Sequence, residues 1–520
     1  MDFLGNVVLA LITLFLFSYW RFKKAREFFD KNGVAYLKPT FLVGNIAPVL
    51  LMNKPMAVYH KEMYEKLHPH KHAGYFLFNR SFLMIRDPDL IRHIMVKDFK
   101  YFHDRSIPIN PKIDRIGHNL LTMKGDEWKT LRVKLTSTFT SGKMKLMFPL
   151  VQECGNKLTQ VLGTMTSEAF NIKDLSARYT CDVIGTCAFG IETHSLDDPN
   201  NEFQEMGKRV FRFRYRNLIA GAFTKLPESV ARFFNIRFVD ESVQDFFISI
   251  IGNTVKFREE NKVTRNDFID LLMSLRDQTM SKYNDHQEQE DLERFLSQVG
   301  EKHAKGQIDM TIDVMAAQCF IFFGAGFETS STALSFLLLE LALHQDIQDK
   351  VREEINTLIN SNPEGLTYDI LKDMTYVDMV IAEGLRKYPA LGFIIRECTE
   401  DYIIPDTKIV VPKNTPVTVP VYGLHNDPQY FEKPDEFYPE HFTKEAIAKR
   451  PHYTYLPFGD GPRGCIGERF GKMQVKVGLI SMIRNFKFQL SPKTSLPIKF
   501  QQHFIILKPK SGIWLKCEKI

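Results

Sequence analysis

Hydrophobic positions first gather at the amino terminus. Residues 3–20 are mostly apolar and carry no charge, and the basic stretch RFKKAR follows directly. A run of this length just spans a bilayer core, and Tyr19 and Trp20 end it as expected at a headgroup boundary. A cleaved secretory signal is the alternative, but no basic region precedes the run and no small-residue cleavage site follows it. We therefore expect a membrane anchor over residues 1–20, with its basic flank in the cytosol.

The rest of the chain shows no internal repeat and no low-complexity linker that would divide it. We expect a basic linker over residues 21–45 and one globular body over residues 46–520. Early in that body, the stretch HAGYFLFNRSFLMIRDP alternates as a strand hairpin does, with Asn79-Arg80 at the turn.

Helical spacing prevails from about Gly125 to Asn360, and short β-rich runs broken by prolines follow from Thr399 to Val421. After Cys465 an apolar stripe at helical spacing runs from Ile466 to Ile480, and the end of the chain again has the pattern of short strands. The whole pattern predicts a mainly α protein with a minor β part (α+β).

One apolar stretch, from Asp313 to His344, contains no proline and would form a helix about 48 Å long. It could be mistaken for a second membrane span, but it carries too many polar side chains. We therefore expect a buried core helix that crosses the whole body. The polar side chains are Gln318, Glu328, Thr329, Ser330, Ser331, Thr332 and Glu340.

The centre of this helix, GAGFETS, breaks local rules. Two glycines each cost about 1 kcal/mol against alanine in a helix interior, and Glu328 and Thr329 are polar groups where burial is unfavourable unless they are paired. One interpretation is a kink with a satisfied polar pair. The other is a widened helix beside a cofactor, where Thr329 and Glu328 handle protons through water. Ile321, Ala325 and Thr329 would then look into the same space.

Composition adds limits. Hydrophobic residues make up 44% of the 520 positions and phenylalanine is abundant, with 43 residues, which suits apolar cavities as well as plain core packing. The formal charge of +6 is mild, and no Lys/Arg tract with interleaved aromatics indicates nucleic acid. The seven cysteines are odd in number and sparse, without a CxxC pair. This disfavours a disulfide framework or a zinc site and fits a reducing, cytosol-facing compartment.

Several charged residues occur in short motifs, and each motif alone is weak evidence for a functional site. Glu383 and Arg386 in IAEGLRKYP share a helix face, and Pro389 ends that helix. Trp128 and Arg132 lie four apart in a helical stretch. The other residues of this kind are Arg105 in FHDR, Arg396 in FIIRECT and His441 in FYPEHF. Each could be a solvated charge, so only their joint occurrence in this order is informative.

Cys465 lies in PFGDGPRGCIGERF, just before the helical stripe, where a helix N-terminus stabilises a thiolate. Gly459 and Gly461 permit a tight turn whose amides can point at the sulfur. Gly467 leaves room for a flat partner, and Arg463 can meet an anionic group. A nucleophile would need a local general base, and the stretch offers none. A thiolate ligand to the iron of a planar macrocycle that bears carboxylates accounts for all these residues.

FGDGPRGCIG resembles the FxxGxRxCxG signature of the cytochrome P-450 superfamily, the haem-thiolate monooxygenases. AGFETS, EGLR and PEHF resemble the other motifs of that family in the expected order, and the N-terminal anchor fits its microsomal members. CDVIGTCAFG, LDDPNNEF and WKTLRVKLTSTFTSGKMK look most like the insect branch rich in detoxification enzymes. The resemblance covers essentially the whole chain and implies that family's fold, with a long central helix over a buried haem.

The resemblance implies a role for each matching residue. Cys465 would be the proximal iron ligand, and Glu383 with Arg386 a buried structural pair. Thr329 with Glu328 would deliver protons to dioxygen. His441 departs from the family, which usually has Arg there, so the third member of the ion network with that pair differs, and we expect core stability to depend on pH as a result. The cofactor-binding set comprises Arg105, Trp128, Arg132, Arg396, Phe458, Arg463 and Gly467, with the arginines and Trp128 on the haem propionates.

The resemblance also implies partners. The chain has no GxGxxG or Walker fingerprint, so electrons would come from NADPH through a flavoprotein reductase, with cytochrome b5 as a second candidate donor. The anchor would place the protein in the endoplasmic reticulum membrane as a single-pass protein that faces the cytosol. A basic docking face for an acidic partner would include Lys129, Lys134, Lys143, Lys145, Lys472 and Lys476.

The reaction implied is insertion of one oxygen atom from dioxygen into a lipophilic substrate. Xenobiotics, insecticides, plant toxins and endogenous lipids or hormones all remain open. A haem-thiolate isomerase or dehydratase is one alternative, although the intact Glu328-Thr329 pair argues against it. A non-catalytic membrane protein that binds haem or ligand is another. Candidate pocket residues, chosen by motif position, are Ile107, Ile321, Ala325, Leu391 and Ile505.

Overall fold

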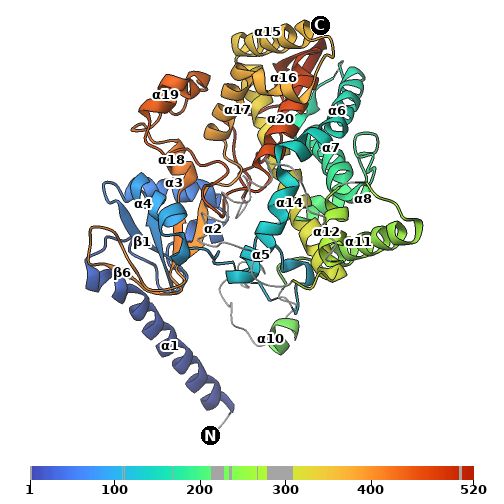
Figure 1. Cartoon of the computed structure of the whole chain (residues 1–520). Helices are drawn as coiled ribbons and strands as arrows, with labels where there is room; N and C mark the ends of the chain where they lie inside the picture. The colour runs from blue at the N-terminus through green and yellow to red at the C-terminus, as the bar shows by residue number, and fades with distance from the viewer. Residues whose placement is uncertain are drawn as a thin grey trace.

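Helix α14 (Ile312–Leu343) crosses the centre of the molecule, and the other elements pack around it (Figure 1). Thr311 caps its N-terminus by accepting a hydrogen bond from the Val314 N–H at 3.3 Å. Most of its side chains are buried against α7, α11, α17 and α20, whose bounds are given below. The prediction of a buried core helix is confirmed, with each end within one residue. The computed structural model describes residues 3–107, 109–110, 112–166, 168–211, 228–233, 237–265, 267–277, 308–502 and 506–520.

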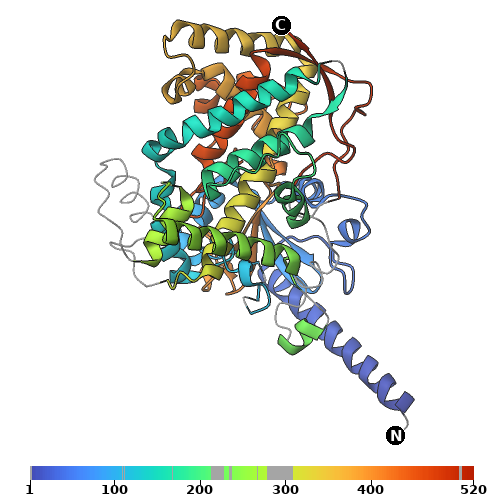
Figure 2. The ribbon, with the colours of Figure 1, turned by 90° about the vertical axis from the view of Figure 1, so that its right-hand side faces the viewer.

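The helices within residues 47–276 begin on the side of the main sheet and continue mostly beside α14, with the short α10 set apart from it (Figures 1 and 2). They are α2 (Ala47–Leu50), α3 (Met56–Lys66), α4 (Pro88–Arg92), α5 (Gly125–Thr136), α6 (Ser141–Gly163), α7 (Ile172–Ile184), α8 (Glu202–Val210), α10 (Glu228–Phe233), α11 (Glu241–Asn261) and α12 (Phe268–Arg276). Short π or 3₁₀ turns are η1 (His93–Lys97), η2 (Phe99–Tyr101), η3 (Arg115–Gly117), η4 (Ser137–Phe139) and η5 (Gly185–Phe189).

The helices after α14 carry the two charged motifs and the cysteine. They are α15 (Gln345–Ser361), α16 (Tyr368–Asp373), α17 (Thr375–Lys387), α18 (Val421–His425), the 3₁₀ turn η6 (Pro439–Phe442), α19 (Lys444–Lys449) and α20 (Glu468–Ile483). Helix α20 approaches α7 and α14 closely at Gly478, where a Cβ would lie 2.7 Å from the Tyr179 ring and 3.0 Å from Leu334. A larger residue there would push these helices apart.

The main sheet has four strands in the order β1 (His72–Leu77), β2 (Arg80–Ile85), β7 (Pro416–Val419) and β4 (Ile394–Glu397). Strands β2 and β7 are parallel, and the other neighbours are antiparallel. The predicted hairpin is present, but its turn is Phe78-Asn79 and not Asn79-Arg80. Leu77 pairs with Arg80 across the strands, and Phe78 takes the left-handed backbone conformation that closes the turn.

Two smaller sheets complete the β part. One has the order β3 (Phe170–Asn171), β9 (Trp514–Lys519) and β8 (Phe486–Leu490), and the other pairs β5 (Tyr402–Ile403) with β6 (Val410–Val411). Strands β5, β6 and β9 lie where the sequence predicts short strands, whereas β3 lies inside the stretch from Gly125 to Asn360 that was expected to be helical. The fold is therefore mainly α with a minor β part, as expected.

Helix α1 (Phe3–Asn32) projects away from the body as one continuous helix (Figures 1 and 2). It does not end at Trp20 but continues through the basic stretch, so the segment expected as a linker begins as helix. The Phe41 ring packs against Phe15 and Phe22, with ring centroids 5.5 and 5.4 Å apart. Gly5–Asn32 and Ile312–Leu343 are the described helices long and apolar enough to cross a membrane, and the second is 72% buried.

Two hydrophobic cores meet at the cysteine loop, residues 457–466. The larger core surrounds α14, and the smaller one lies under the main sheet and α4. The loop touches both cores, because Phe458 and Ile466 pack against the larger one, while Gly459 and Gly461 contact Ile394 of β4 and Met95 of η1 in the smaller one. The fold thus holds the cysteine at the boundary between its helical part and its sheet.

Candidate functional site

Glycines set the backbone of the cysteine loop. Gly459 and Gly461 have φ of +70° and +69°, which non-glycine residues adopt only at a cost. A Cβ on Gly461 would also lie 2.0 Å from the Met95 carbonyl oxygen. The Cys465 N–H donates to the Phe458 carbonyl at 2.8 Å, which closes the loop directly before α20. Cys465 therefore lies at a helix N-terminus, as predicted.

The surroundings of the Cys465 thiol act on its charge in opposite directions, and the net effect raises its pKa. Cys465 is exposed, yet its interior position raises the pKa of the thiol, and a hydrogen bond from the Gly467 N–H and the charges of Arg132 and Arg105 oppose this effect. Gly467 is the N-cap of α20, so the amide that reaches the sulfur belongs to the helix start and not to the Gly459–Gly461 turn. A metal cation bound to this sulfur would favour the thiolate form over the neutral thiol.

Four arginines from separate segments form a cluster, and two of them, Arg105 and Arg132, act directly on the Cys465 thiol. Burial lowers the pKa of Arg105 and of Arg132 to about 10, although the nearby Cys465 acts in the opposite direction. Burial also lowers the pKa values of Arg396 and Arg463 well below the ordinary value, and Arg105 adds to both shifts. Buried cations are costly unless an anion compensates them. The cluster is therefore suited to an anionic group.

A buried hydrogen-bond donor, without a partner in the part of the chain that the structure describes, also indicates that an anionic group binds at the arginine cluster. Arg396 on β4 donates from Nη1 to the Ile395 carbonyl at 2.9 Å, but among the described residues its buried Nε has no hydrogen-bond partner. Buried polar atoms are nearly always paired in folded proteins. A planar group that carries carboxylates would supply the missing acceptor, so the residues present fit such a group.

Arg463 is as buried as Arg396 and is bonded mainly to backbone carbonyls. Its guanidinium donates to the His103 and Met123 carbonyls at 2.7 and 2.6 Å and stacks on Trp128 with 3.9 Å to the ring centroid. Arg105 in turn donates to the Arg463 carbonyl at 3.1 Å. Arg463 and Trp128 therefore tie the segment before α5 to the cysteine loop, and their contact with a carboxylate stays a prediction.

The open face of α14 is the one that the sequence predicts. Ala325 is exposed and Ile321 and Thr329 are half-buried in a stretch whose other positions are mostly buried. The Thr329 hydroxyl donates to the Ala325 carbonyl one turn earlier. The helix is continuous here, so the expected widening is absent. Gly326 instead lets α7 approach, because a Cβ there would lie 2.3 Å from Ile184.

Phe139 joins this face to the cysteine. Its ring stacks on Phe322 of α14 with centroids 5.2 Å apart, and its edge lies 3.9 Å from the position of a Cβ on Gly467. No other described atom lies within 4 Å of that position. Gly467 therefore leaves space beside Cys465, as predicted for a flat partner, and Phe139 is a site residue that the sequence motifs did not indicate.

The remaining predicted residues are placed unevenly. Ile107 is half-buried, and Leu391 is 41% exposed and forms a β-bridge with Ile506. Ile505 lies outside the described residues. Glu328 is buried and pairs with Lys173 and Lys508, so it does not share the open face with Thr329.

One lysine of the predicted docking face is in the interior. Lys476 is 5% exposed, donates to the Leu371 carbonyl at 2.5 Å and pairs with Asp378 at 2.6 Å. Its placement in a solvated face is therefore wrong. The spacing from Lys472 puts Lys476 one helical turn further along α20, where its side chain meets Leu371 of α16 and Asp378 of α17.

The Glu383–Arg386 pair is fully buried on α17. Arg386 donates to both carboxylate oxygens of Glu383, from Nη2 at 2.7 Å and from Nε at 2.8 Å, and also to the His425 and Glu436 carbonyls. The Tyr438 N–H donates to Glu383 at 2.9 Å. Burial opposes ionisation of Glu383, but the hydrogen bonds from Arg386 and His441 outweigh it and hold the pKa of Glu383 below its ordinary value.

His441 is the third member of this network. Its Nδ1 lies 3.1 Å from Glu383 Oε2 and its Nε2 lies 2.7 Å from the Glu432 carbonyl. Arg450, which the motifs did not indicate, donates to the His441 carbonyl at 3.0 Å and lies over the Phe431 ring at 4.4 Å. Arg450 thus brings a guanidinium into the region where the family usually has one at position 441.

A buried histidine connects this network to the cysteine loop. His425 hydrogen-bonds through Nδ1 to the Arg386 carbonyl at 3.2 Å, and its Nε2 accepts from the Leu456 N–H at 2.8 Å. Burial, with help from Arg386, lowers the pKa of His425 to about 3, so the ring is neutral and can accept. Tyr455 adds a second connection by donating to the Ala382 carbonyl at 2.9 Å.

Substitution of His441 should weaken this network in a pH-dependent way. His441→Leu removes the ring that connects Glu383 to the Glu432 carbonyl, so unfolding at neutral pH should become easier by about 1.5–3 kcal/mol. A carboxylate with a lowered pKa stabilises the fold above the ordinary pKa of glutamate, and this stabilisation is lost as the pH falls. The difference between wild type and variant should therefore shrink towards about pH 4.

Urea unfolding of the two proteins at several pH values measures this difference. His441→Arg, which restores a donor of the usual family type, is the control and should recover most of the stability. A difference that stays constant from neutral to acidic pH would contradict the network as described.

Comparison with known proteins identifies the family to which the chain belongs. The family model described as Cytochrome P450 matches residues 35–516. "Probable cytochrome P450 6a14" and "Cytochrome P450 6a9" of Drosophila melanogaster are 39% and 38% identical, each over 99% of this chain and 99% of the relative. "Cytochrome P450 6k1" of Blattella germanica is 37% identical over 99% of this chain and 97% of the relative. The predicted insect branch is thus confirmed, and the chain belongs to the cytochrome P450 family of haem-thiolate monooxygenases.

Proposed function

We propose that the protein oxidises lipophilic foreign compounds at the endoplasmic reticulum membrane, with electrons that a flavoprotein reductase takes from NADPH. The observation that carries this proposal is the exposed Cys465 thiol beside a cluster of four arginines, of which Arg396 and Arg463 are almost fully buried. When bound, the haem activates dioxygen so that one oxygen atom enters the substrate and the other leaves as water.

Different residues of the chain would bind the iron, bind the propionates and handle protons. Cys465 would bind the iron, and the Gly467 N–H with Arg132 would stabilise the negative sulfur. Arg105, Arg132 and Arg396 would hold the propionates, since three guanidinium groups near one thiol suit two carboxylates. Thr329 would hold or pass a proton from its hydroxyl on the open face of α14.

The expected substrate is lipophilic because the open face of α14 is apolar apart from Thr329. Ile321, Phe322 and Ala325 line it, and Leu391 adds an exposed apolar side chain from the segment before β4. Such surfaces favour ligands by burial and give little directional selectivity. A broad range of apolar compounds therefore fits better than one polar metabolite, and foreign compounds are the class that the insect branch suggests.

A reconstituted assay separates this function from the two alternatives. The holoenzyme in lipid vesicles, mixed with an NADPH-dependent flavoprotein reductase, should convert a fluorogenic alkoxycoumarin. With ¹⁸O₂ as the oxygen source, each oxygenated product should carry one heavy oxygen atom. Product formation without NADPH would indicate an isomerase or dehydratase instead. Soret shifts with lipophiles but no product under any condition would indicate a binding protein.

Helix α1 is the proposed anchor. It is apolar and exposed over most of residues 5–20, and its basic side chains begin at Arg21. Lys24 lies 5.0 Å from the centroid of the Trp20 ring and Arg21 lies 5.9 Å from that of Phe17, contacts that suit a headgroup boundary. On this proposal the helix passes the bilayer once and the body faces the cytosol.

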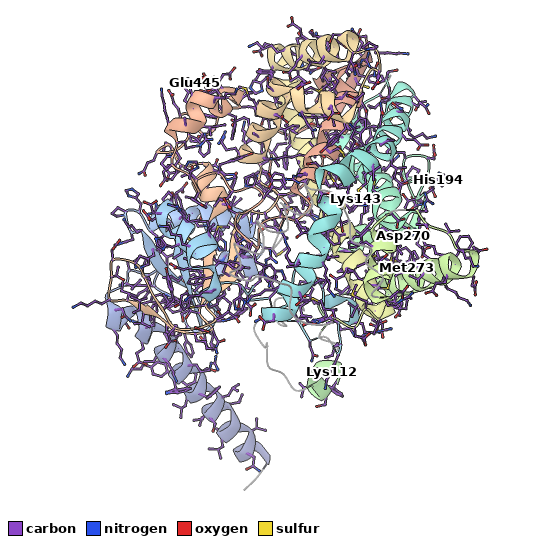
Figure 3. The ribbon with its side chains drawn as sticks, in the orientation of Figure 1. Lys112, Lys143, His194, Asp270, Met273 and Glu445 are labelled. Carbon is purple, nitrogen blue, oxygen red and sulfur yellow. The ribbon has the colours of Figure 1, made fainter. Side chains whose placement is uncertain are left out.

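The reductase would dock on the side of the cysteine loop, where α5, α6 and α20 present basic residues. Lys145 and Lys472 are exposed, and Lys129, Lys134 and Lys143 are half-buried; Figure 3 marks Lys143 at the start of α6. Lys472 pairs with Glu468 at 2.6 Å and Lys129 with Asp126 at 3.2 Å. Exposed pairs of this kind are weak, so both lysines can exchange partners. Cytochrome b5, as an acidic donor, could use the same face.

Charge reversal on this face should weaken reductase binding in a salt-dependent way. Lys129→Glu with Lys472→Glu should raise the apparent reductase Kd at low ionic strength, and the effect should diminish at high salt because screening removes it. Titration of reductase against the initial rate measures this. Lys444→Glu is the matched control, since α19 lies well away from Lys143 (Figure 3). An equal loss at low and high salt would argue against electrostatic docking.

A further inference from the structure

The carboxylate of Glu328 is held from two sides. Its Oε1 lies 3.2 Å from Lys173 Nζ and 3.7 Å from Lys508 Nζ. The side chain of Glu328 is 7% exposed, and those of the two lysines are 15% and 17% exposed. Ion pairs that are shielded from water in this way are stronger than pairs on the surface. Lys173 is the closer of the two cations.

The backbone of Lys173 is fixed by the start of α7. Asn171, the N-cap, accepts a hydrogen bond from the Lys173 N–H at 3.1 Å, and Asn171 itself pairs with Trp514 of β9. The Lys173 ammonium also donates to the Ser331 hydroxyl at 2.7 Å. Ser331 follows Glu328 by three positions and therefore lies on the same side of α14. One ammonium thus binds both side chains and orients the glutamate.

Lys508 reaches the same carboxylate from the C-terminal segment. The Gln501 N–H donates to the Lys508 carbonyl at 2.8 Å, and the Leu507 N–H donates to the Ala390 carbonyl at 3.0 Å. Ile506, two residues earlier, bridges to Leu391, a candidate pocket residue. Lys508 therefore connects Glu328 to the segment that contains Ile506, which bridges to the segment of Leu391.

We propose that Lys173 is a positioning residue for the oxidation reaction. It holds the Glu328 carboxylate charged and turned away from the open face, with Lys508 as a second cation, so that Thr329 alone presents a proton donor there. The inference rests on the proposed function, because orientation of Glu328 matters to turnover only when protons pass this part of α14. Loss of Lys173 would free the carboxylate and disturb proton supply during oxygen reduction.

The charges that face Lys173 come from three segments: Glu328 of α14, Lys508 of the C-terminal segment and Asp174 of α7. Burial lowers the pKa of Lys173; Glu328 and Asp174 favour its ammonium form, and Lys508 disfavours it. Lys173 should therefore lose its charge at a lower pH than an exposed lysine does. An arginine at this position would keep its charge throughout the range in which enzymes are assayed.

The reconstituted holoenzyme with reductase and the fluorogenic alkoxycoumarin tests the positioning role. Lys173→Met should lower the amount of product formed per NADPH several-fold and raise hydrogen peroxide by the corresponding amount. Lys173→Arg should restore most of the yield and extend it to higher pH than in the wild type. Lys208→Met is the matched control. Lys208 is an exposed lysine of α8 that contacts the same Asp174 at 3.4 Å, and its loss should leave the yield unchanged.

A second measurement needs neither reductase nor substrate. Thermal unfolding of the resting holoenzyme is compared for Lys173→Met, Glu328→Gln and the double variant. Because the two groups interact directly, the Tm shift of the double variant should be smaller than the sum of the single shifts. Additive shifts would overturn the ion pair on which the inference depends.

The outcomes separate the two claims. A wild-type yield from Lys173→Met together with non-additive Tm shifts would overturn the positioning role and leave the proposed function intact. Absence of product from the wild type itself would overturn the proposed function, and the positioning role with it, even where the Tm shifts show that Lys173 and Glu328 interact.

Discussion

Buried positive charge around a single thiol is the constraint on which the rest of this structure depends. Four guanidinium groups, from the segment before α5, from α5 itself, from β4 and from the cysteine loop, are gathered in one cluster that reaches Cys465 through Arg105 and Arg132. Several positive charges removed from water oppose folding unless an anion compensates them. The arrangement becomes favourable when the sulfur is negative and an anionic group lies among the arginines, so cofactor binding and folding stabilise each other.

The hydrogen-bond network behind the loop keeps that thiol in place. Glu383 and Arg386 on α17 bind each other, and His425 carries the connection from Arg386 to the Leu456 N–H at the start of the loop. His441 and Arg450 close the other end. Each of these side chains bonds to the backbone, and Glu383, Arg386 and His441 also bond to one another, which makes the support rigid. A haem-thiolate enzyme needs such rigidity because the sulfur must stay on the iron while electrons and protons arrive.

Features that depend on residues close together in the chain could be predicted from the sequence. The glycines of the cysteine loop, the helix start after Cys465, the Glu383–Arg386 pair and the buried helix α14 depend on neighbours a few positions away, so spacing predicts them. Lys173 and Ser331 are 158 positions apart, and no spacing signals such a contact. The same holds for His425, Arg450 and Phe139. Lys476 was misplaced because a helical pattern does not tell which of two lysines a turn apart is covered by another segment.

The central claim is that Cys465 supplies the thiolate that binds the haem iron. The Soret band of the reduced carbon monoxide complex tests it most directly, since its position reports the ligand opposite the gas. The wild-type protein should show the red-shifted band typical of thiolate ligation. Cys465→Ala should lose that band while circular dichroism still shows a folded, mainly helical chain. A red-shifted band that persists in Cys465→Ala would contradict the account.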